Sequence, residues 1–179
     1  MLCVNLVLPR SPCLRVSVVT PSMIFTARSL DDTRRVGRAL AKVLQAGDVV
    51  ALIGELGAGK TLLVQSIAAQ LGVDPEAVHS PTFVLIQEYD ARIPLVHIDA
   101  YRLEDTDQFL ELGADELLGA DNVCLIEWAD RVAEVLPRDR ITIHLTSTGE
   151  SSRQIEITAT GPRSQQRLAD IEKHLLAAS

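Results

Sequence analysis

A chain of 179 residues with 47% hydrophobic residues is long enough for one globular α/β domain. Its formal net charge of -7 leaves no surplus of Lys and Arg to follow a phosphate backbone, which excludes unaided tight binding to RNA or DNA. The cysteines have no paired spacing, and no apolar run approaches the roughly 20 residues of a membrane span, so a soluble protein of the reducing cytoplasm is expected.

Residues 1–22 are predicted to be an extension outside a single domain that spans 23–179. The segment contains Arg10 and Arg15 but no acid, and three prolines interrupt any regular element. It lacks the continuous apolar core and the small-residue cleavage site of a targeting peptide. We therefore expect either a disordered extension or a start codon assigned too far upstream.

The first part of the domain predicts an alternation of strands and helices. Ser29 has the position of an N-cap, and Gly47 and Gly72 stop the two helices. The apolar run from Asp48 to Ile53 is too short for a helix and is typical of a strand buried on both faces. Strands are expected over 23–27 and 48–53, and helices over 30–44 and 61–72.

The second part of the domain continues this pattern and adds alternating strands. Strands are expected over 82–90, 94–101, 122–128, 140–147 and 153–159, and helices over 106–118, 129–136 and 165–177. The first two strands flank a turn, which predicts a hairpin or two neighbouring strands. The last two alternate apolar and polar residues, which predicts an antiparallel hairpin at the sheet edge. The whole is an α/β sheet with a parallel centre.

The most informative motif lies between the strand 48–53 and the helix that follows it. Gly54 to Thr61 reads GELGAGKT and matches G-x-x-x-x-G-K-[ST]. Its glycines let the backbone curl with N–H groups pointing inward, at the positive end of a helix. We expect Lys60 to reach the β- and γ-phosphates of a nucleoside triphosphate and the Thr61 hydroxyl to bind Mg²⁺. The remaining residues of this phosphate loop that we expect to contact the nucleotide are Glu55, Leu56, Gly57, Ala58 and Gly59.

Two acids follow buried strands. Asp99 closes the strand LVHID and Glu127 closes VCLIE. At the carboxyl ends of parallel strands, both side chains would face the crevice where ligands bind. A phosphate loop needs a further carboxylate for the metal and a polar group for the attacking water. Asp99 and Glu127 are therefore candidates for both roles, and either acid can hold either role.

Four segments together resemble one family. GELGAGKT, SPTFVLIQEY, HIDAYRL and LIEW have the order and spacing of the TsaE (YjeE) family, small bacterial ATPases required to make threonylcarbamoyladenosine in tRNA. The resemblance runs from about Ser29 to Arg153. It implies a P-loop NTPase-like three-layer sandwich, in which a mixed sheet has a parallel core and an antiparallel edge hairpin. It also implies ATP and Mg²⁺ as cofactors and TsaD and TsaB as partners, with tRNA reached only through that complex.

The resemblance also implies roles for single residues. It ties Lys60, Asp99 and Glu127 to catalysis, and Thr61, Glu127 and Asp99 to the metal. Thr82 matches a threonine that could sense the γ-phosphate, and Trp128 matches a tryptophan near the nucleotide. Weaker nucleotide contacts are implied for Ser29, Thr33 and Arg153. The family loop often has aspartate where Glu55 stands, and in the HIDAYRL segment leucine is frequent in the family where Ala100 stands.

Other interpretations of the same residues stay open. Trp128 is equally expected as a core aromatic residue, and His97 as a buried core histidine without a ligand. The chain could be a nucleotide-gated interaction module in which hydrolysis is incidental. A small-molecule kinase would need an arginine-rich lid, whereas the segment 100–119 is acidic, and a regulatory GTPase would need an N-K-x-D motif, which is absent. No arginine finger is evident, so slow hydrolysis is expected without partners.

Overall fold

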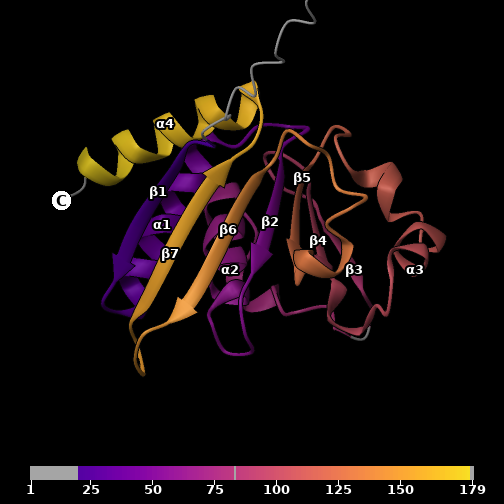
Figure 1. Cartoon of the computed structure of the whole chain (residues 1–179), viewed down its shortest axis with the longest axis horizontal. Coiled ribbons are helices and arrows are strands. Elements are labelled where there is room, and N and C mark those ends of the chain that lie inside the picture. Colours follow the sequence, from indigo (N-terminus) through magenta and orange to yellow (C-terminus); the bar gives the residue numbers. More distant parts are fainter. Residues whose placement is uncertain (1–19, 83, 178–179) are drawn as a thin grey trace, which may run out of the picture.

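A computed structural model describes residues 20–82 and 84–177, so nearly all of the predicted extension lies outside the described residues. The domain is built on one seven-stranded sheet of order β1-β7-β6-β2-β5-β4-β3 (Figure 1). The strands are β1 (Ser22–Ala27), β2 (Val49–Ile53), β3 (Ile86–Tyr89), β4 (Leu95–Asp99), β5 (Val123–Glu127), β6 (Ile141–Ser147) and β7 (Arg153–Ala159). The helices are α1 (Leu30–Val43), α2 (Lys60–Leu71), α3 (Thr106–Glu111) and α4 (Pro162–Ala177).

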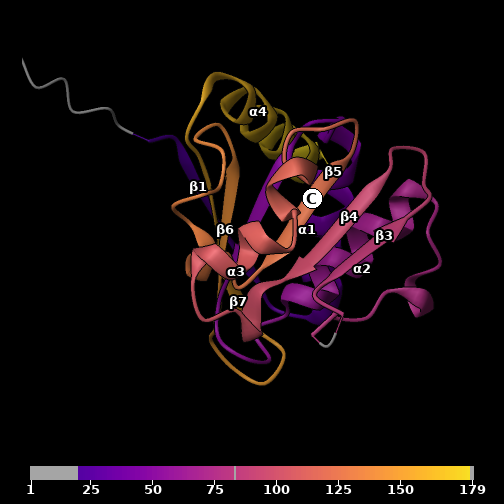
Figure 2. The same ribbon diagram turned by 90° about the vertical axis from the view of Figure 1, so that its right-hand side faces the viewer.

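The sheet has the predicted mixed character with a parallel core, but antiparallel strands lie on both sides of that core and not on one side alone. β6, β2, β5 and β4 are joined by parallel pairs. β6 and β7 form the expected hairpin, and β3 pairs with β4 in antiparallel fashion (Figure 2). The hairpin is not the outermost part of the sheet, because β1 pairs antiparallel with β7 and becomes the edge strand.

Two hydrophobic clusters fill the two faces of the sheet and make the three layers. On one face, α1, α2 and α4 contribute Leu40, Ile67 and Ile171 to a cluster with alternate residues of the strands. On the other face, α3 and the short 3₁₀ helices cover β2, β5 and β4, where Phe109 packs with Ile98. Figure 1 shows α1 and α2 behind the strands and α3 at the opposite end of the sheet from α4.

The second face of β6, β7 and β1 is mostly polar instead, although it includes the exposed Ile24 of β1. Alternation along these strands places His144 and Gln154 on the exposed side, while the apolar residues between them enter the core below α1 and α4. A third layer is therefore present only over the central and β3-side strands. Among the described residues, no helix combines the length and apolar character needed to cross a membrane.

Helix α1 begins as predicted. The Ser29 hydroxyl accepts a hydrogen bond from the Asp32 backbone N–H at 3.1 Å, and the Asp32 carboxylate accepts one from the Ser29 N–H at 3.1 Å. This reciprocal pair satisfies donors that the first helical turn leaves free. The Arg28 N–H also donates to Asp32, and together these bonds hold the pKa of the Asp32 carboxyl below its usual value. Ser29 is therefore fully used as a cap.

Three predicted elements are shorter or less regular than the sequence pattern suggests. The strand predicted over 82–90 covers only Ile86–Tyr89, because the Val84 and Leu85 N–H groups donate to the Pro81 carbonyl in a turn and Leu85 has φ 68°. The helix predicted over 106–118 breaks at Gly113, whose φ of 67° separates α3 from a 3₁₀ helix. The helix predicted over 129–136 is a single 3₁₀ helix, Ala129–Val132.

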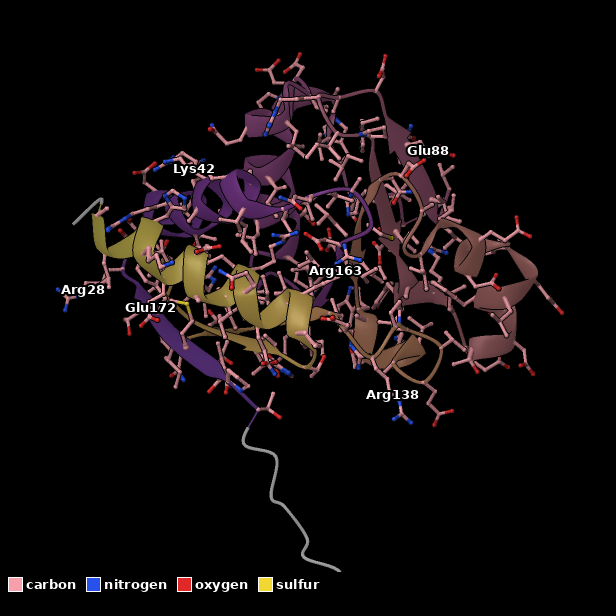
Figure 3. All side chains as sticks on the ribbon, turned by 90° about the horizontal axis from the view of Figure 1, so that it is seen from above. Arg28, Lys42, Glu88, Arg138, Arg163 and Glu172 are labelled. Carbon is pink, nitrogen blue, oxygen red and sulfur yellow. The ribbon has the colours of Figure 1, made fainter. Side chains whose placement is uncertain are left out.

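The last helix is fastened to the strand that precedes the phosphate loop. Asp48, only 7% exposed, accepts a hydrogen bond from Arg163 Nη2 at 3.0 Å and one from Arg167 Nε at 2.9 Å. Figure 3 shows Arg163 at the beginning of α4. A buried carboxylate needs such partners, because an unpaired charge in the interior is strongly disfavoured. The contacts of Asp48 with the two arginines therefore fix the position of α4 relative to the beginning of β2.

Candidate functional site

The phosphate loop joins β2 to α2 and needs glycine at defined places. Gly57 and Gly59 have φ values of 79° and 103°, which residues with a side chain rarely adopt. Gly54 is required for a different reason, because a Cβ atom there would lie 2.4 Å from the Leu145 carbonyl oxygen of β6. The spacing of glycines in the sequence thus follows from two backbone turns and one close approach between neighbouring strands.

Helix α2 starts inside the motif, at Lys60. No side chain caps its first turn, so the backbone N–H groups there remain free to meet an anion. The positive end of the helix dipole lies at the same place. This geometry is the one that binds phosphate groups at helix N-termini.

Lys60 is folded back over the loop. Its Nζ donates to the Gly54 carbonyl at 2.6 Å and to the Glu55 carbonyl at 3.0 Å, and lies 3.8 Å from the centroid of the Trp128 ring. Burial lowers the pKa of the Lys60 ammonium, and the Glu127 carboxylate opposes that shift. The side chain is thus held by weak acceptors that a phosphate can replace.

The two predicted acids lie next to each other. Asp99 and Glu127 end the parallel neighbours β4 and β5 and are paired in register. Both line a pocket of about 380 Å³ together with Lys60 and Thr61. The expectation that the strand ends bring both carboxylates to the phosphate loop is therefore met in the structure.

Glu127 is held by two donors. The Thr61 hydroxyl donates to its Oε1 at 2.8 Å, and His97 Nε2 lies 3.0 Å from the same oxygen. His97 is completely buried, as expected of a core histidine, but it contacts the site. The contact of His97 with Glu127 was not predicted from the sequence, where the signal was a polar residue within an apolar strand.

Asp99 is surrounded by hydroxyl groups. Its Oδ2 accepts from the Ser80 hydroxyl and, at 2.9 Å, from the Thr82 hydroxyl, and its Oδ1 accepts from the Tyr101 N–H at 3.0 Å. Thr82 therefore lies in the pocket, as the resemblance implied. Ser80 and Tyr101 line the pocket as well and were not predicted as site residues, although they belong to the segments SPTFVLIQEY and HIDAYRL.

Trp128 lies at the pocket wall and also packs against the second hydrophobic cluster. Its backbone has φ 56°, an unusual value for a large residue, and such values often mark functional sites. The ring stacks at 48° on Tyr101 with centroids 5.0 Å apart. The side chain is only partly buried and contacts both the pocket and the core cluster, so its assignment as a nucleotide contact stays a prediction.

The other residues of the loop have distinct positions. Gly57 and Gly59 line the pocket, and Leu56 lies at its rim with 85% of its surface exposed. The Glu55 side chain is exposed, and the Ala58 side chain is buried. Both therefore take part in the site through their backbone, since the Ala58 N–H donates to the Glu55 carbonyl at 3.1 Å.

Three predicted nucleotide contacts lie outside the residues that line the pocket. Ser29 caps α1, and Thr33 is buried with a hydroxyl that has no partner among the described residues. The Arg153 guanidinium lies behind the loop, where Nε donates to the Ala58 carbonyl at 2.9 Å and Nη2 to the Gly57 carbonyl at 3.2 Å. Its Nη1 also donates to the Ser152 carbonyl at 2.8 Å in the β6–β7 turn.

The ligand set suits magnesium. Among the described residues, no three His, Cys, Asp or Glu side chains come together closely enough to hold a metal on their own. Mg²⁺ does not require such a cage, because it usually keeps several waters and binds one or two carboxylates together with substrate phosphates. The Thr61 hydroxyl and the Glu127 and Asp99 carboxylates supply oxygen ligands of this kind beside the phosphate loop.

Comparisons with known proteins agree on one family. Residues 27–155 match the model of "Threonylcarbamoyl adenosine biosynthesis protein TsaE". The chain is 39% identical over 145 residues to the Bacillus subtilis tRNA threonylcarbamoyladenosine biosynthesis protein TsaE, covering 80% of this chain and 90% of that protein. It is 41% identical over 135 residues to the Treponema pallidum protein of the same name, covering 75% and 99%.

A solved structure supports the same assignment. The structure titled "Crystal structure of Bacillus subtilus YdiB" superposes with a TM-score of 0.75 and 32% identity, covering 88% of this chain and 99% of that one. The matched regions include the phosphate loop, both acids and Trp128. The chain belongs to the TsaE family of proteins for threonylcarbamoyladenosine biosynthesis in tRNA, and its nucleotide-binding P-loop fold is that of this family.

Proposed function

We propose that this chain binds ATP with Mg²⁺ and hydrolyses it in support of threonylcarbamoyladenosine modification of tRNA beside the anticodon. The partners would be TsaD and TsaB, which carry out the transfer and bring the chain to tRNA in the cytoplasm. One observation carries the proposal: an ammonium, a free helix N-terminus, a hydroxyl and two carboxylates line a single pocket at the phosphate loop. No other described pocket combines these groups.

In this proposal each charged or hydroxyl-bearing residue at the phosphate loop has a defined role. Lys60 leaves the Gly54 and Glu55 carbonyls and pairs with the phosphates, where its charge compensates the charge that develops during transfer. Bound Mg²⁺ supplies further charge neutralisation at the β- and γ-phosphates. The Thr61 oxygen and Glu127 would hold the metal. The Thr61 hydroxyl, which donates to Glu127 Oε1, would turn its lone pairs toward the metal.

Asp99 is proposed to orient the attacking water or a water on the metal. Its Oδ2 already accepts hydrogen bonds from two hydroxyl groups, so it is fixed in direction, as a water-orienting group requires. Lys60 is the only basic side chain among the described pocket residues. A transition state that gains negative charge would thus lack a second cationic side chain beside Lys60 and the metal, which supports slow hydrolysis until a partner completes the site.

The test is ATP hydrolysis with and without purified TsaD and TsaB. We expect stimulation by the partners, loss of hydrolysis with retained ATP binding in Glu127→Gln, and loss of ATP binding in Lys60→Met. Glu111→Gln, which neutralises an exposed acid of α3, is the matched control and should keep wild-type rates. Absence of both stimulation and co-elution with the partners would contradict the role in tRNA modification, while leaving nucleotide binding in place.

A second function, a nucleotide-gated interaction module, is favoured by the position of Thr82. Its hydroxyl joins the loop after α2 directly to Asp99, so a change at the γ-phosphate can reach that loop. In that case ATP binding alone would change the surface and hydrolysis would be incidental. Glu127→Gln distinguishes the two: many rounds of tRNA modification by the hydrolysis-deficient variant with its partners would favour the module.

A further inference from the structure

His97 lies in the middle of β4, completely buried, directly opposite Leu125 of β5 in the parallel register. Residues two apart on a strand point to the same face. His97 therefore shares its face with Leu95 and Asp99, on the side of the sheet that α2 covers. Leu95 and Leu125 belong to the apolar cluster on that side, so the imidazole is a polar group in apolar surroundings.

Burial of a polar ring in these surroundings lowers the stability of the fold, which a functional role of the ring would explain. Its Nδ1 is buried and has no hydrogen-bond partner among the described residues. A buried polar atom without a partner destabilises the folded state, and an apolar side chain of similar size would avoid that loss. The other ring nitrogen, Nε2, lies 3.0 Å from Glu127 Oε1. A carboxylate only accepts, so Nε2 carries the proton.

We propose that His97 is a positioning residue that fixes the carboxylate of Glu127 so that its Oε2 is presented to the metal and the nucleotide. The Oε1 atom receives both His97 Nε2 at 3.0 Å and the Thr61 hydroxyl at 2.8 Å. The Thr61 hydroxyl also lies 3.1 Å from Oε2, and its single proton serves only one of the two oxygens at a time. His97 contacts Oε1 alone, so it fixes Oε1 and leaves Oε2 to a ligand in the pocket once the Thr61 hydroxyl turns away. The proposal rests on the function proposed above.

The contact between His97 and Glu127 matters because Thr61 has a second proposed role, as a metal ligand. If the Thr61 oxygen approaches a metal, its hydroxyl must turn with the metal and can no longer fix Glu127 on its own. His97 comes from a buried strand that is paired on both sides, so its position does not depend on the ligand. Partners of this kind behind a metal-binding group are typically worth about 10–100-fold in metal affinity or activity.

The test compares His97→Leu, which removes the donor, with His97→Gln, whose amide N–H has a similar reach. Mn²⁺ is titrated into the ATP-bound protein and followed by electron paramagnetic resonance, and ATP affinity is measured separately in EDTA by calorimetry. We expect His97→Leu to weaken Mn²⁺ binding by about 10–100-fold. ATP affinity in EDTA should stay within about 3-fold of wild type, and His97→Gln should restore most of the Mn²⁺ affinity.

Controls separate the proposal from a general effect of the substitution. His174→Leu removes an exposed histidine of α4 and should leave Mn²⁺ binding unchanged. His97→Asn, whose amide is too short to reach Glu127, replaces His97→Leu if the latter does not fold. Unchanged Mn²⁺ binding in the folded donor-free variant, or an equal fall in His97→Gln, would overturn the proposal. If wild-type protein itself binds no ATP and Mn²⁺, the proposed function fails instead.

Discussion

Replacement of Arg153 by methionine removes the guanidinium that ties the phosphate loop to the β6–β7 turn. Methionine keeps much of the aliphatic volume, so the change is mainly the loss of hydrogen bonds. The bond from Nε to the Ala58 carbonyl, at 2.9 Å, is buried, and the Ala58 carbonyl is left without that partner in the variant. The bonds to Gly57 and Gly149 reach residues at the surface, where water can replace the guanidinium.

The magnitude follows from the buried bond. A hydrogen bond to a charged group contributes about 1.5–3 kcal/mol, and the solvent-accessible ones add little. We therefore expect Arg153→Met to lower the free energy of unfolding by about 2–3 kcal/mol in the absence of any nucleotide. Urea unfolding followed by circular dichroism measures this. Gln154→Met, an exposed neighbour on the same strand, should change it by less than about 0.5 kcal/mol.

The same measurement decides between two roles of Arg153. If the guanidinium supports the loop through its carbonyl contacts, Arg153→Met lowers the free energy of unfolding of the ligand-free protein. ATP affinity then also falls, because the loop is less ordered. If it contacts the nucleotide directly, as the resemblance implies, ATP affinity falls while the ligand-free unfolding free energy stays at the wild-type value. The second outcome would refute the reasoning from the carbonyl contacts.

Further predictions concern three other residues. Trp128 is the only tryptophan of the chain, and ATP should change its emission by drawing the Lys60 ammonium from its ring; constant emission at saturating ATP would contradict this. Burial raises the pKa of the Cys124 thiol to about 12, so iodoacetamide at pH 8 should modify it only after unfolding, and mass spectrometry detecting it in native protein would count against the buried position. Gly54→Ala brings a methyl group within 2.4 Å of the Leu145 oxygen and should lower the free energy of unfolding by about 2 kcal/mol or more, as measured in urea; a stable variant with normal ATP affinity would disprove the close approach.

Much of the fold was predictable because short-range patterns determine it. Ser29 and Asp32 form a cap between neighbours three residues apart, and the glycines of the phosphate loop satisfy local backbone turns. The strands of the parallel core were predicted from continuous apolar runs. The position of both acids followed from a general property of parallel sheets, since strand ends meet at one edge.

The sequence was less informative where an element or a site depends on one unusual backbone conformation or on a contact between residues far apart in the chain. Leu85 shortens β3 through a positive φ that its residue type does not suggest, and Gly113 divides an otherwise continuous amphipathic pattern. β1 lies outside β7 in the sheet, and local periodicity gives no information about the order of the strands. The contact of His97 with Glu127 spans 30 residues, and that of Arg153 with Ala58 spans 95 residues.

The pairing of Asp48 with α4 has a consequence for synthesis on the ribosome. Arg163 and Arg167 follow Asp48 by 115 and 119 residues. At about 5–20 residues per second, translation needs about 6–24 s to supply them. During that time the Asp48 carboxylate lacks both arginine partners, so the contact that positions α4 forms only near the end of translation. Products truncated before residue 163 would lack both arginines and become substrates for proteolysis.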